Sequence, residues 1–197
     1  MSEKIQVLYE ATPNPQSMKF NFTCQISNET AFFDNPALAA RSPLAQKVFG
    51  FPWAQSVMIG PYFVTITKQD WVDWTVIADP LADLLAEHLE RKEGVLLELD
   101  TVDSTTEGSS HIEGNDSEIV QQIKKILDNE IRPAVAMDGG DIIFSRYENN
   151  RLYLKLQGSC SGCPSSVITL KEGIESRMKQ SIPELVEVID DASMPAL

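Results

Sequence analysis

Residues 152–179 read LYLKLQGSCSGCPSSVITLKEGIESRMK, and this stretch decides how the second half of the chain folds. Its first six residues alternate apolar and polar side chains, which is typical of a strand with one buried face. A loop with two glycines and two cysteines follows. A helix is then expected over 165–179, because apolar residues recur on one helical face at Val167, Leu170, Ile174 and Met178.

The residues around this stretch complete a small mixed domain. Ser117 is placed to cap a helix that Pro133 is expected to break, and the apolar residues of this helix follow the 3.6-residue period, at Ile119, Ile123, Ile126, Leu127 and Ile131. Asn149-Asn150 fits a type I′ turn between strands at 142–147 and 152–157. With a last strand at 186–189, the predicted order is helix, strand, strand, helix, strand (α-β-β-α-β).

The first half of the chain also mixes the two kinds of element. The expected strands are Ile5–Tyr9, Met18–Cys24, Val57–Ile59 and Phe63–Thr67, and the expected helices run from Ser42-Pro43 to Gly50, over Asp70–Ile77 and over Asp79–Lys92. Gly60-Pro61 indicates a hairpin between two of these strands. Interspersed helices and hairpins favour the α+β class, with two small α/β-layer domains.

A shift in composition separates the two halves. Residues 101–117 hold seven Ser or Thr, four acidic residues and no Lys or Arg. Such a stretch buries too little apolar surface to offset the entropy lost on ordering. We therefore expect a flexible linker at 101–117 between domains at 1–100 and 118–197.

The composition excludes several functional classes. Of 197 residues, 16 are Lys or Arg and 29 are Asp or Glu, so the formal net charge is −13, which disfavours nucleic acid or an anionic membrane as partner. Three cysteines are too few for a disulfide scaffold. No apolar run is long enough to span a membrane. The first residues look like neither a secretory signal nor a transit peptide, so a cytoplasmic protein is expected.

Cys160 and Cys163 carry the most specific chemical signal. The two-residue gap lets both sulfurs point at one centre, and Gly162 permits the tight backbone this needs. Because a helix begins near Pro164, its dipole is expected to favour the thiolate form. Spacing alone leaves four interpretations open: an iron–sulfur site, a zinc site, dithiol–disulfide exchange, or two small thiols that fill a turn.

The number of ligands narrows these interpretations. Iron–sulfur clusters and structural zinc normally take four protein ligands, and this loop offers two. Cys24 shares a predicted strand face with Met18, Phe20 and Phe22, so it is expected in a core. His88 extends an apolar helix face and His111 lies in the linker, so neither is a favoured ligand. Two chains that each give two cysteines to one site on a two-fold axis satisfy the count.

Three further features have structural explanations. Asp138-Gly139-Gly140-Asp141 lacks the ligands of a calcium or phosphate loop and is expected to form a turn that supports the cysteine loop. Trp71 and Trp74 fall on one face of the predicted helix and are expected in the core, the alternative being an exposed docking patch. Arg132 is expected to be solvated, the alternative being that it steadies the acidic residues of this turn.

The chain resembles the NifU/Nfu family along almost all of its length outside the linker. The C-terminal match rests on IRPAVAMDGGD (131–141), LKLQGSCSGCPSS (154–166) and TLKEGIE (169–175). The N-terminal match rests on TPNP (12–15) with MKF (18–20), on SPLA (42–45) through Phe49-Gly50, and on IGP (59–61) with VT (64–65).

This resemblance implies a non-enzymatic carrier or scaffold that holds a [4Fe–4S] cluster between two subunits, with Cys160 and Cys163 as ligands, and with a [2Fe–2S] form left open. The implied partners are upstream cluster-assembly proteins and apo iron–sulfur client proteins. A homodimer is expected when the cluster is bound, with no nucleic acid and no membrane. The lack of a transit peptide favours a bacterial cytosolic member. The alternatives are a dithiol–disulfide oxidoreductase and a zinc-stabilised dimeric interaction module.

Overall fold

The computed structural model describes residues 5–97, 117–161 and 164–191. The chain divides into two compact units, one that contains residues 5–97 and one that contains residues 117–191. Each unit combines helices with a sheet, which confirms the α+β class. The expected linker lies outside the described residues except for Ser117, so its boundaries stay a prediction.

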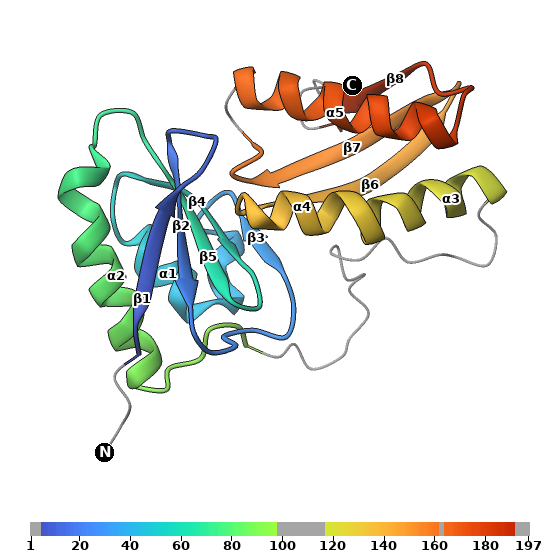
Figure 1. The fold of residues 1–197 in the computed structure, drawn as a ribbon. Helices are drawn as coiled ribbons and strands as arrows, with labels where there is room; N and C mark the ends of the chain where they lie inside the picture. The colour runs from blue at the N-terminus through green and yellow to red at the C-terminus, as the bar shows by residue number, and fades with distance from the viewer. Residues whose placement is uncertain (1–4, 98–116, 162–163, 192–197) are drawn as a thin grey trace. The chain divides into compact units, whose positions relative to one another are not determined.

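The N-terminal unit is built on a five-stranded antiparallel sheet in the order β1-β2-β5-β4-β3 (Figure 1). The strands are β1 (Val7–Ala11), β2 (Ser17–Phe22), β3 (Ala31–Phe33), β4 (Ala54–Ile59) and β5 (Phe63–Lys68), and the helices are α1 (Pro43–Phe49) and α2 (Trp74–Glu90), with a short 3₁₀ helix at Leu38–Arg41. Both hairpins expected from the sequence form, β1 with β2 and β4 with β5.

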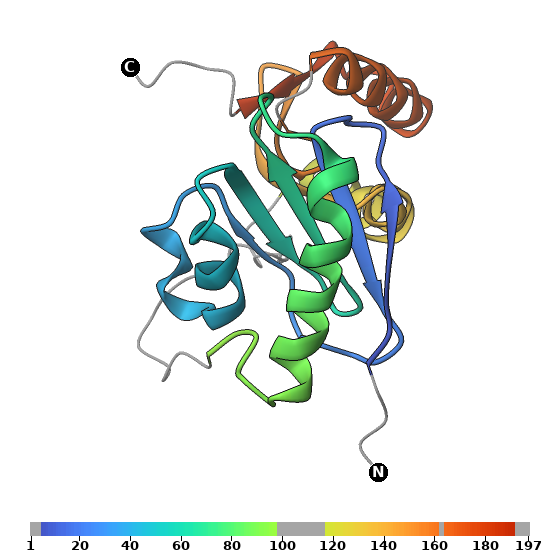
Figure 2. The same ribbon diagram turned by 90° about the vertical axis from the view of Figure 1, so that its left-hand side faces the viewer.

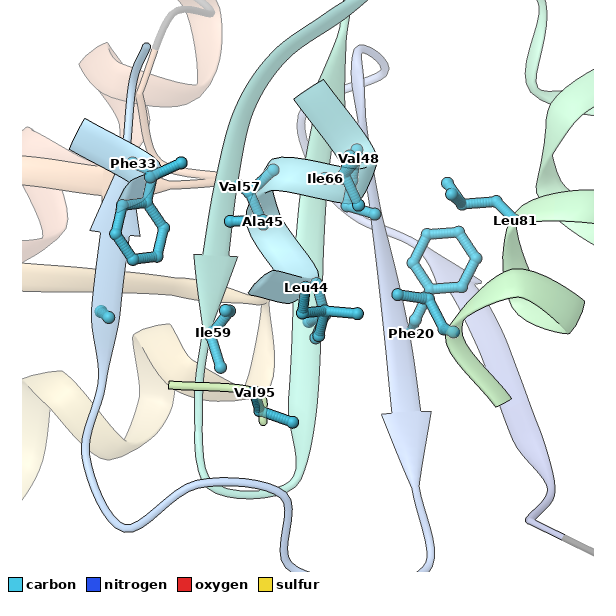
Figure 3. Packing of buried hydrophobic residues seen from close by; sticks show 14 of the residues in the cluster. Phe20, Phe33, Leu44, Ala45, Val48, Val57, Ile59, Ile66, Leu81 and Val95 are labelled. Carbon is cyan, nitrogen blue, oxygen red and sulfur yellow. The ribbon is translucent and has the colours of Figure 1, made fainter. Parts of the chain in front are cut away.

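Helices α1 and α2 cover the same face of this sheet (Figure 2). Alternate residues of the strands point into the layer between helices and sheet, where Phe20 and Ile66 are fully buried. Leu44 of α1 and Leu81 of α2 close the layer from the helix side (Figure 3). This burial supplies the main stabilisation of a sheet whose strands are only three to six residues long.

The α1 helix begins where the sequence predicts it. Ser42 accepts a hydrogen bond at Oγ from the Ala45 amide at 3.0 Å, and Pro43 occupies the first helical position. Gly50 follows the last helical residue, as expected. The same Ser42 hydroxyl donates to the carbonyl of Val95 at 2.7 Å, so the cap also fastens the segment after α2.

The α2 helix differs from the prediction of two helices. It is continuous from Trp74 to Glu90, is capped by Asp73 and contains Pro80 in its interior. A proline removes only one backbone hydrogen bond, and the buried face of Ala78, Leu81 and Leu85 on both sides of it offsets that loss. The expectation that Asp79 caps a second helix was therefore wrong.

The C-terminal unit has the predicted order of elements. Helices α3 (Glu118–Ile126) and α4 (Arg132–Met137) precede strands β6 (Gly140–Glu148) and β7 (Arg151–Gly158), helix α5 (Pro164–Ser181) and strand β8 (Glu187–Asp190). Strand β7 pairs antiparallel with β6 and parallel with β8. Asn149 and Asn150 have φ of 51° and 59°, which confirms the type I′ turn.

Pro133 does not break the first helical region. A π-helical turn over Leu127–Ile131 links α3 to α4. The widened turn makes room for the proline ring, which in a regular helix would clash with the carbonyl of Asn129. Helices and sheet of this unit enclose one apolar core, and its most buried members include Ile123, Leu127, Ile142, Leu154 and Met178.

Candidate metal centre

Cys160 lies just beyond the end of β7, in the loop that leads to α5. Gly158, the last residue of β7, has φ of 65°, a left-handed conformation that glycine adopts without strain and that turns the chain out of the strand. Ser161 closes this turn by donating at Oγ to the Gly158 carbonyl at 2.8 Å. Cys160 is 7% exposed and packs against the core of the unit. Cys163 lies outside the described residues.

The Asp138–Asp141 segment forms the turn that the sequence predicts, and this turn holds the cysteine loop. Gly139 has φ of 78° and accepts a hydrogen bond at its carbonyl from the Ser159 amide at 3.2 Å. The Ser159 hydroxyl donates to the Asp138 carbonyl at 2.6 Å. Two hydrogen bonds from one serine therefore tie the loop of Cys160 to the turn before β6.

Gly140 makes the space for the Cys160 sulfur. A Cβ atom placed on Gly140 would lie 2.3 Å from Cys160 Sγ, 3.1 Å from the Gln157 carbonyl oxygen and 3.2 Å from Ser159 Oγ. The sulfur therefore rests against bare backbone, and any larger residue at position 140 displaces it. Among the described residues, this close approach to Gly140 constrains the position of the Cys160 sulfur most tightly.

Arg132 supports this turn, so the alternative weighed for it is confirmed and the expected solvated position was wrong. Its Nε and Nη2 atoms each donate to one carboxylate oxygen of Asp141 at 2.8 Å, and Asp141 is buried. Asp141 Oδ1 also accepts from the Ile142 amide at 2.8 Å. The planar guanidinium suits such a two-point contact. The acidic residues on either side of the two glycines are the signal in the sequence for this contact.

The Cys160 thiol is protonated at neutral pH in this state. The pKa of Cys160 is raised to about 12, mainly because the side chain is buried; the hydrogen bond with Ser159 lowers the pKa, and the charges of Asp138 and Asp141 raise it. The direction of this shift is opposite to the expected one, because burial disfavours the charged thiolate. A soft metal that binds here has to displace the thiol proton.

The other cysteine and the described histidine belong to the N-terminal unit. Cys24 is exposed, contrary to the expectation of a core position, because β2 ends at Phe22 and the chain bends before Ile26 donates its amide to the Pro61 carbonyl. His88 is buried in the N-terminal unit. His111 lies outside the described residues. Within residues 5–97, 117–161 and 164–191, no group of three or more His, Cys, Asp or Glu is placed to hold a metal ion.

Trp71 and Trp74 differ in how deeply they are buried. Trp74 is half-buried, packs at a ring distance of 6.4 Å from Phe20 and donates its indole N–H to the Pro15 carbonyl at 3.1 Å. Trp71 precedes α2 and is 67% exposed, so its expected place in the core was wrong. The reason is that the helix starts at Trp74, so the two side chains do not share a helical face.

Both halves of the chain match known families. Residues 5–92 match the family described as "Scaffold protein Nfu/NifU N terminal", and residues 123–189 match the family described as "NifU-like domain". The chain is 40% identical over 187 residues to "NFU1 iron-sulfur cluster scaffold homolog, mitochondrial" of Homo sapiens, an alignment that covers 92% of this chain and 71% of that protein. The chain belongs to the NifU/Nfu family.

The chain is also similar to a second curated protein and to a solved structure. The protein of the same name from Drosophila ananassae is 38% identical, over 92% of this chain and 63% of its own length. The solution structure of a NifU-like protein from Saccharomyces cerevisiae has 32% identity and a TM-score of 0.44, and covers 49% of this chain and 88% of that one. The two family matches and the human relative confirm the family resemblance seen in the sequence.

The names of these Nfu relatives contradict one expectation. Both matched proteins are named mitochondrial, so the expectation of a cytoplasmic protein was wrong. That expectation rested on the first residues of a chain that spans between 63% and 71% of the length of these two relatives, and such residues do not determine a location. Among the described helices, none has the length and apolar character needed to cross a membrane.

Proposed function

We propose that this chain is a non-enzymatic iron–sulfur cluster carrier that binds a [4Fe–4S] cluster through Cys160 and Cys163 and passes it to apo-proteins. The observation that carries the proposal is the position of Cys160. Its sulfur lies against the backbone of Gly140, and the neighbouring Ser159 holds the loop by a hydrogen bond to the Asp138 carbonyl. Thiolate sulfur is the ligand that iron–sulfur clusters take in proteins. The names of the Nfu relatives, which are iron–sulfur cluster scaffolds, support the same cargo.

A homodimer follows from the number of ligands. A [4Fe–4S] cluster normally takes about four thiolates. The described residues supply Cys160 alone, Cys163 would supply a second thiolate, and the exposed Cys24 belongs to the other unit. Two chains related by a two-fold axis complete the set with no further ligand type.

Transfer would proceed by exchange of ligands one at a time. A thiolate of the client forms a bond to one iron, the bond from that iron to the carrier sulfur breaks, and the released sulfur takes up a proton. The iron and sulfide of the cargo are neither oxidised nor reduced in such a step. The high pKa of Cys160 in the cluster-free state favours this release, because the freed sulfur returns to a seat where the protonated form is stable.

The test is anaerobic reconstitution with iron and sulfide, followed by the visible spectrum and by counts of iron, sulfide and zinc. The intact protein is expected to turn brown and to hold about four iron ions per two chains. Cys160→Ser and Cys163→Ser should each remove most of this iron. Cys24→Ser is the matched control, because it also removes one thiol but from the N-terminal unit, and it should leave iron binding unchanged.

Other outcomes would support other functions. Stoichiometric zinc without iron would indicate a zinc-stabilised interaction module. Turnover in a disulfide-reduction assay that depends on Cys160 would indicate an oxidoreductase, although an attacking thiol usually has a lowered pKa and that of Cys160 is raised. A cluster absorbance typical of [2Fe–2S] would keep the carrier function and correct the cluster type.

A further inference from the structure

Strand β1 forms an exposed edge of the N-terminal sheet. Within the described part of the chain it pairs only with β2, and four of its five residues are exposed. The opposite edge, β3, has three residues and is largely covered. Proteins usually protect a long exposed edge with lysine, proline or a bulge, because its free backbone groups pair readily with another strand. Residues 7–11 contain no lysine, proline or bulge, and Glu10 is their one charged residue.

A groove lies between helix α2 and residues 5–7, where β1 begins. Figure 2 shows that α2 lies alongside β1. The volume of the groove is about 420 Å³, and it is lined by Ile5, Gln6, Val7, Ala82, Asp83 and Ala86. The two alanines keep the helix wall low, so a neighbouring strand could lie beside β1 without meeting bulky side chains. The groove therefore has the shape that an added extended segment needs.

Asp83 is the one acidic residue that lines the groove, and two further acidic residues of α2 contact β1 and the residue before Gln6. Asp79 accepts a hydrogen bond from the Tyr9 hydroxyl at 2.6 Å, and Glu90 accepts one from the Ile5 amide at 3.2 Å. Asp83 lies between them, is exposed and has no hydrogen bond or ion pair among the described residues. Helix α2 has no Lys or Arg from Trp74 to Glu90.

The acidic row is unfavourable in the isolated protein. Asp79, Asp83 and Glu87 are spaced four residues apart, where like charges destabilise a helix. Arg91 forms an ion pair with Glu87 and so offsets the negative charge of Glu87. No basic residue of the described chain forms an ion pair with Asp83. A cation brought by a partner would remove this repulsion, so the charge pattern favours a basic occupant.

We propose that an extended, Lys- or Arg-bearing segment of a partner protein binds along β1 as an additional strand, with a cationic side chain against Asp83. Backbone hydrogen bonds to β1 would supply affinity, and the acidic row would supply selectivity. A second copy of the chain fits less well, because pairing two β1 edges would bring two acidic rows together. The surface belongs to the unit without Cys160, so the inference goes beyond cluster binding and does not depend on it.

The experiment uses the full chain without a cluster and a synthetic peptide, acetyl-KVKVKVKV-amide, as the probe. Binding is measured by calorimetry, and its place by hydrogen exchange of the backbone amides. The peptide is expected to slow exchange at residues 7–11, whereas acetyl-EVEVEVEV-amide should not. Asp83→Lys should weaken binding about ten-fold, because an attraction becomes a repulsion at a residue that lines the groove.

Asp34→Lys is the matched control. It makes the same change of charge at another exposed acidic residue of the same unit, one that follows the opposite edge strand β3, and it should leave peptide affinity unchanged. An equal loss of peptide affinity in the two variants would show that net charge alone causes the loss, and it would overturn the proposal. Peptide-dependent protection elsewhere than residues 7–11, or no binding, would overturn it as well. So would protection of β1 that depends on protein concentration alone, which would assign the edge to a second copy.

Discussion

At the scale of single residues, the site depends on the absence of a side chain at position 140. The hypothetical Cβ contact of 2.3 Å with Cys160 Sγ is shorter than real Cβ contacts allow, and the neighbouring Gln157 carbonyl is backbone that cannot move aside cheaply. Sequence reasoning recognised the two glycines as a turn. It could not see that one of them faces the cysteine, because the contact joins residues twenty positions apart.

Gly140→Ala is therefore expected to displace the Cys160 sulfur. The C-terminal unit should lose about 1–3 kcal/mol of stability from overpacking, and the reconstituted protein should lose most of its iron. The measurements are urea unfolding followed by far-UV circular dichroism, and iron counting after reconstitution.

Gly173→Ala provides the comparison for this variant. Gly173 lies within α5, where an added Cβ meets nothing within 4 Å. Because alanine favours a helix over glycine, this variant should gain about 0.5–1 kcal/mol of stability and keep its iron. Equal iron binding by the two variants would show that the seat of Cys160 does not require Gly140.

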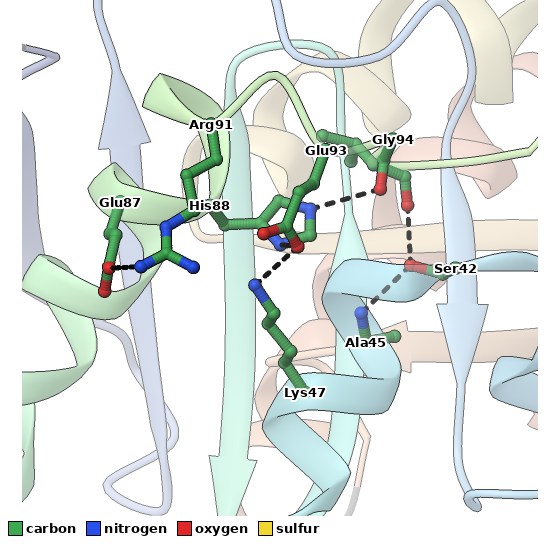
Figure 4. A network of polar contacts seen from close by, with 9 residues as sticks. Ser42, Ala45, Lys47, Glu87, His88, Arg91, Glu93 and Gly94 are labelled. Atoms are coloured by element: carbon green, nitrogen blue, oxygen red, sulfur yellow. Dashed lines mark hydrogen bonds and ion pairs between the residues drawn. The ribbon is translucent and has the colours of Figure 1, made fainter.

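At the scale of elements, a polar cluster fastens the segment after α2 to α1 (Figure 4). The Nε2 atom of buried His88 lies 3.1 Å from the Gly94 carbonyl oxygen, and its Nδ1 atom lies 3.3 Å from the Glu93 carboxylate. Lys47 of α1 contacts the same carboxylate at 2.5 Å. The chain between the end of α2 and residue 97 is thereby held against α1.

The Ser42 cap should contribute measurably to this arrangement. Ser42→Ala leaves the Ala45 amide and the Val95 carbonyl without their partner in a fully buried position. We expect a loss of about 1–2 kcal/mol. All three tryptophans of the chain lie in residues 5–97, so tryptophan fluorescence during urea unfolding reports on this unit alone. A loss below about 0.3 kcal/mol would contradict the described geometry.

The His88 contribution depends on pH in a defined direction. Burial lowers the pKa of His88 from its ordinary value of 6.5, so the unfolded state binds the proton more readily than the folded state. Stability of the N-terminal unit should fall as the pH drops below 6.5, before protonation of Glu93 begins, because the pKa of Glu93 is lowered below 4.5 by Lys47. His88→Gln should flatten the dependence between pH 7 and pH 5. An unchanged slope in this variant would assign the dependence to other groups.

Local patterns predicted most of the elements, and the errors share one cause. Ser42, Asn149 and Asn150 act within a few residues, and the structure places them as predicted. Cys24 and Pro80 depend on where the chain bends or what a helix buries, and those are tertiary effects. The state of Cys160 follows from burial, which neighbouring residues in the sequence do not determine.

At the scale of the whole molecule, the account predicts two units that fold independently. A Glu-specific protease is expected to cut first within residues 101–117, which contain Glu107 and Glu113 but no Lys or Arg. The N-terminal fragment should keep its unfolding free energy to within about 0.5 kcal/mol, as read by tryptophan fluorescence. A larger loss would mean that the two units stabilise each other.

The central claim is that one cluster is shared by two chains. Native mass spectrometry of the anaerobically reconstituted protein tests it most directly, because it weighs the chains and their cargo together. The chain has a mass of 21.9 kDa. The account predicts a loaded species of two chains with a single [4Fe–4S] cluster, which is absent in Cys160→Ser and present in Cys24→Ser. A cluster carried by one chain alone, or a loaded dimer that survives Cys160→Ser, would contradict it.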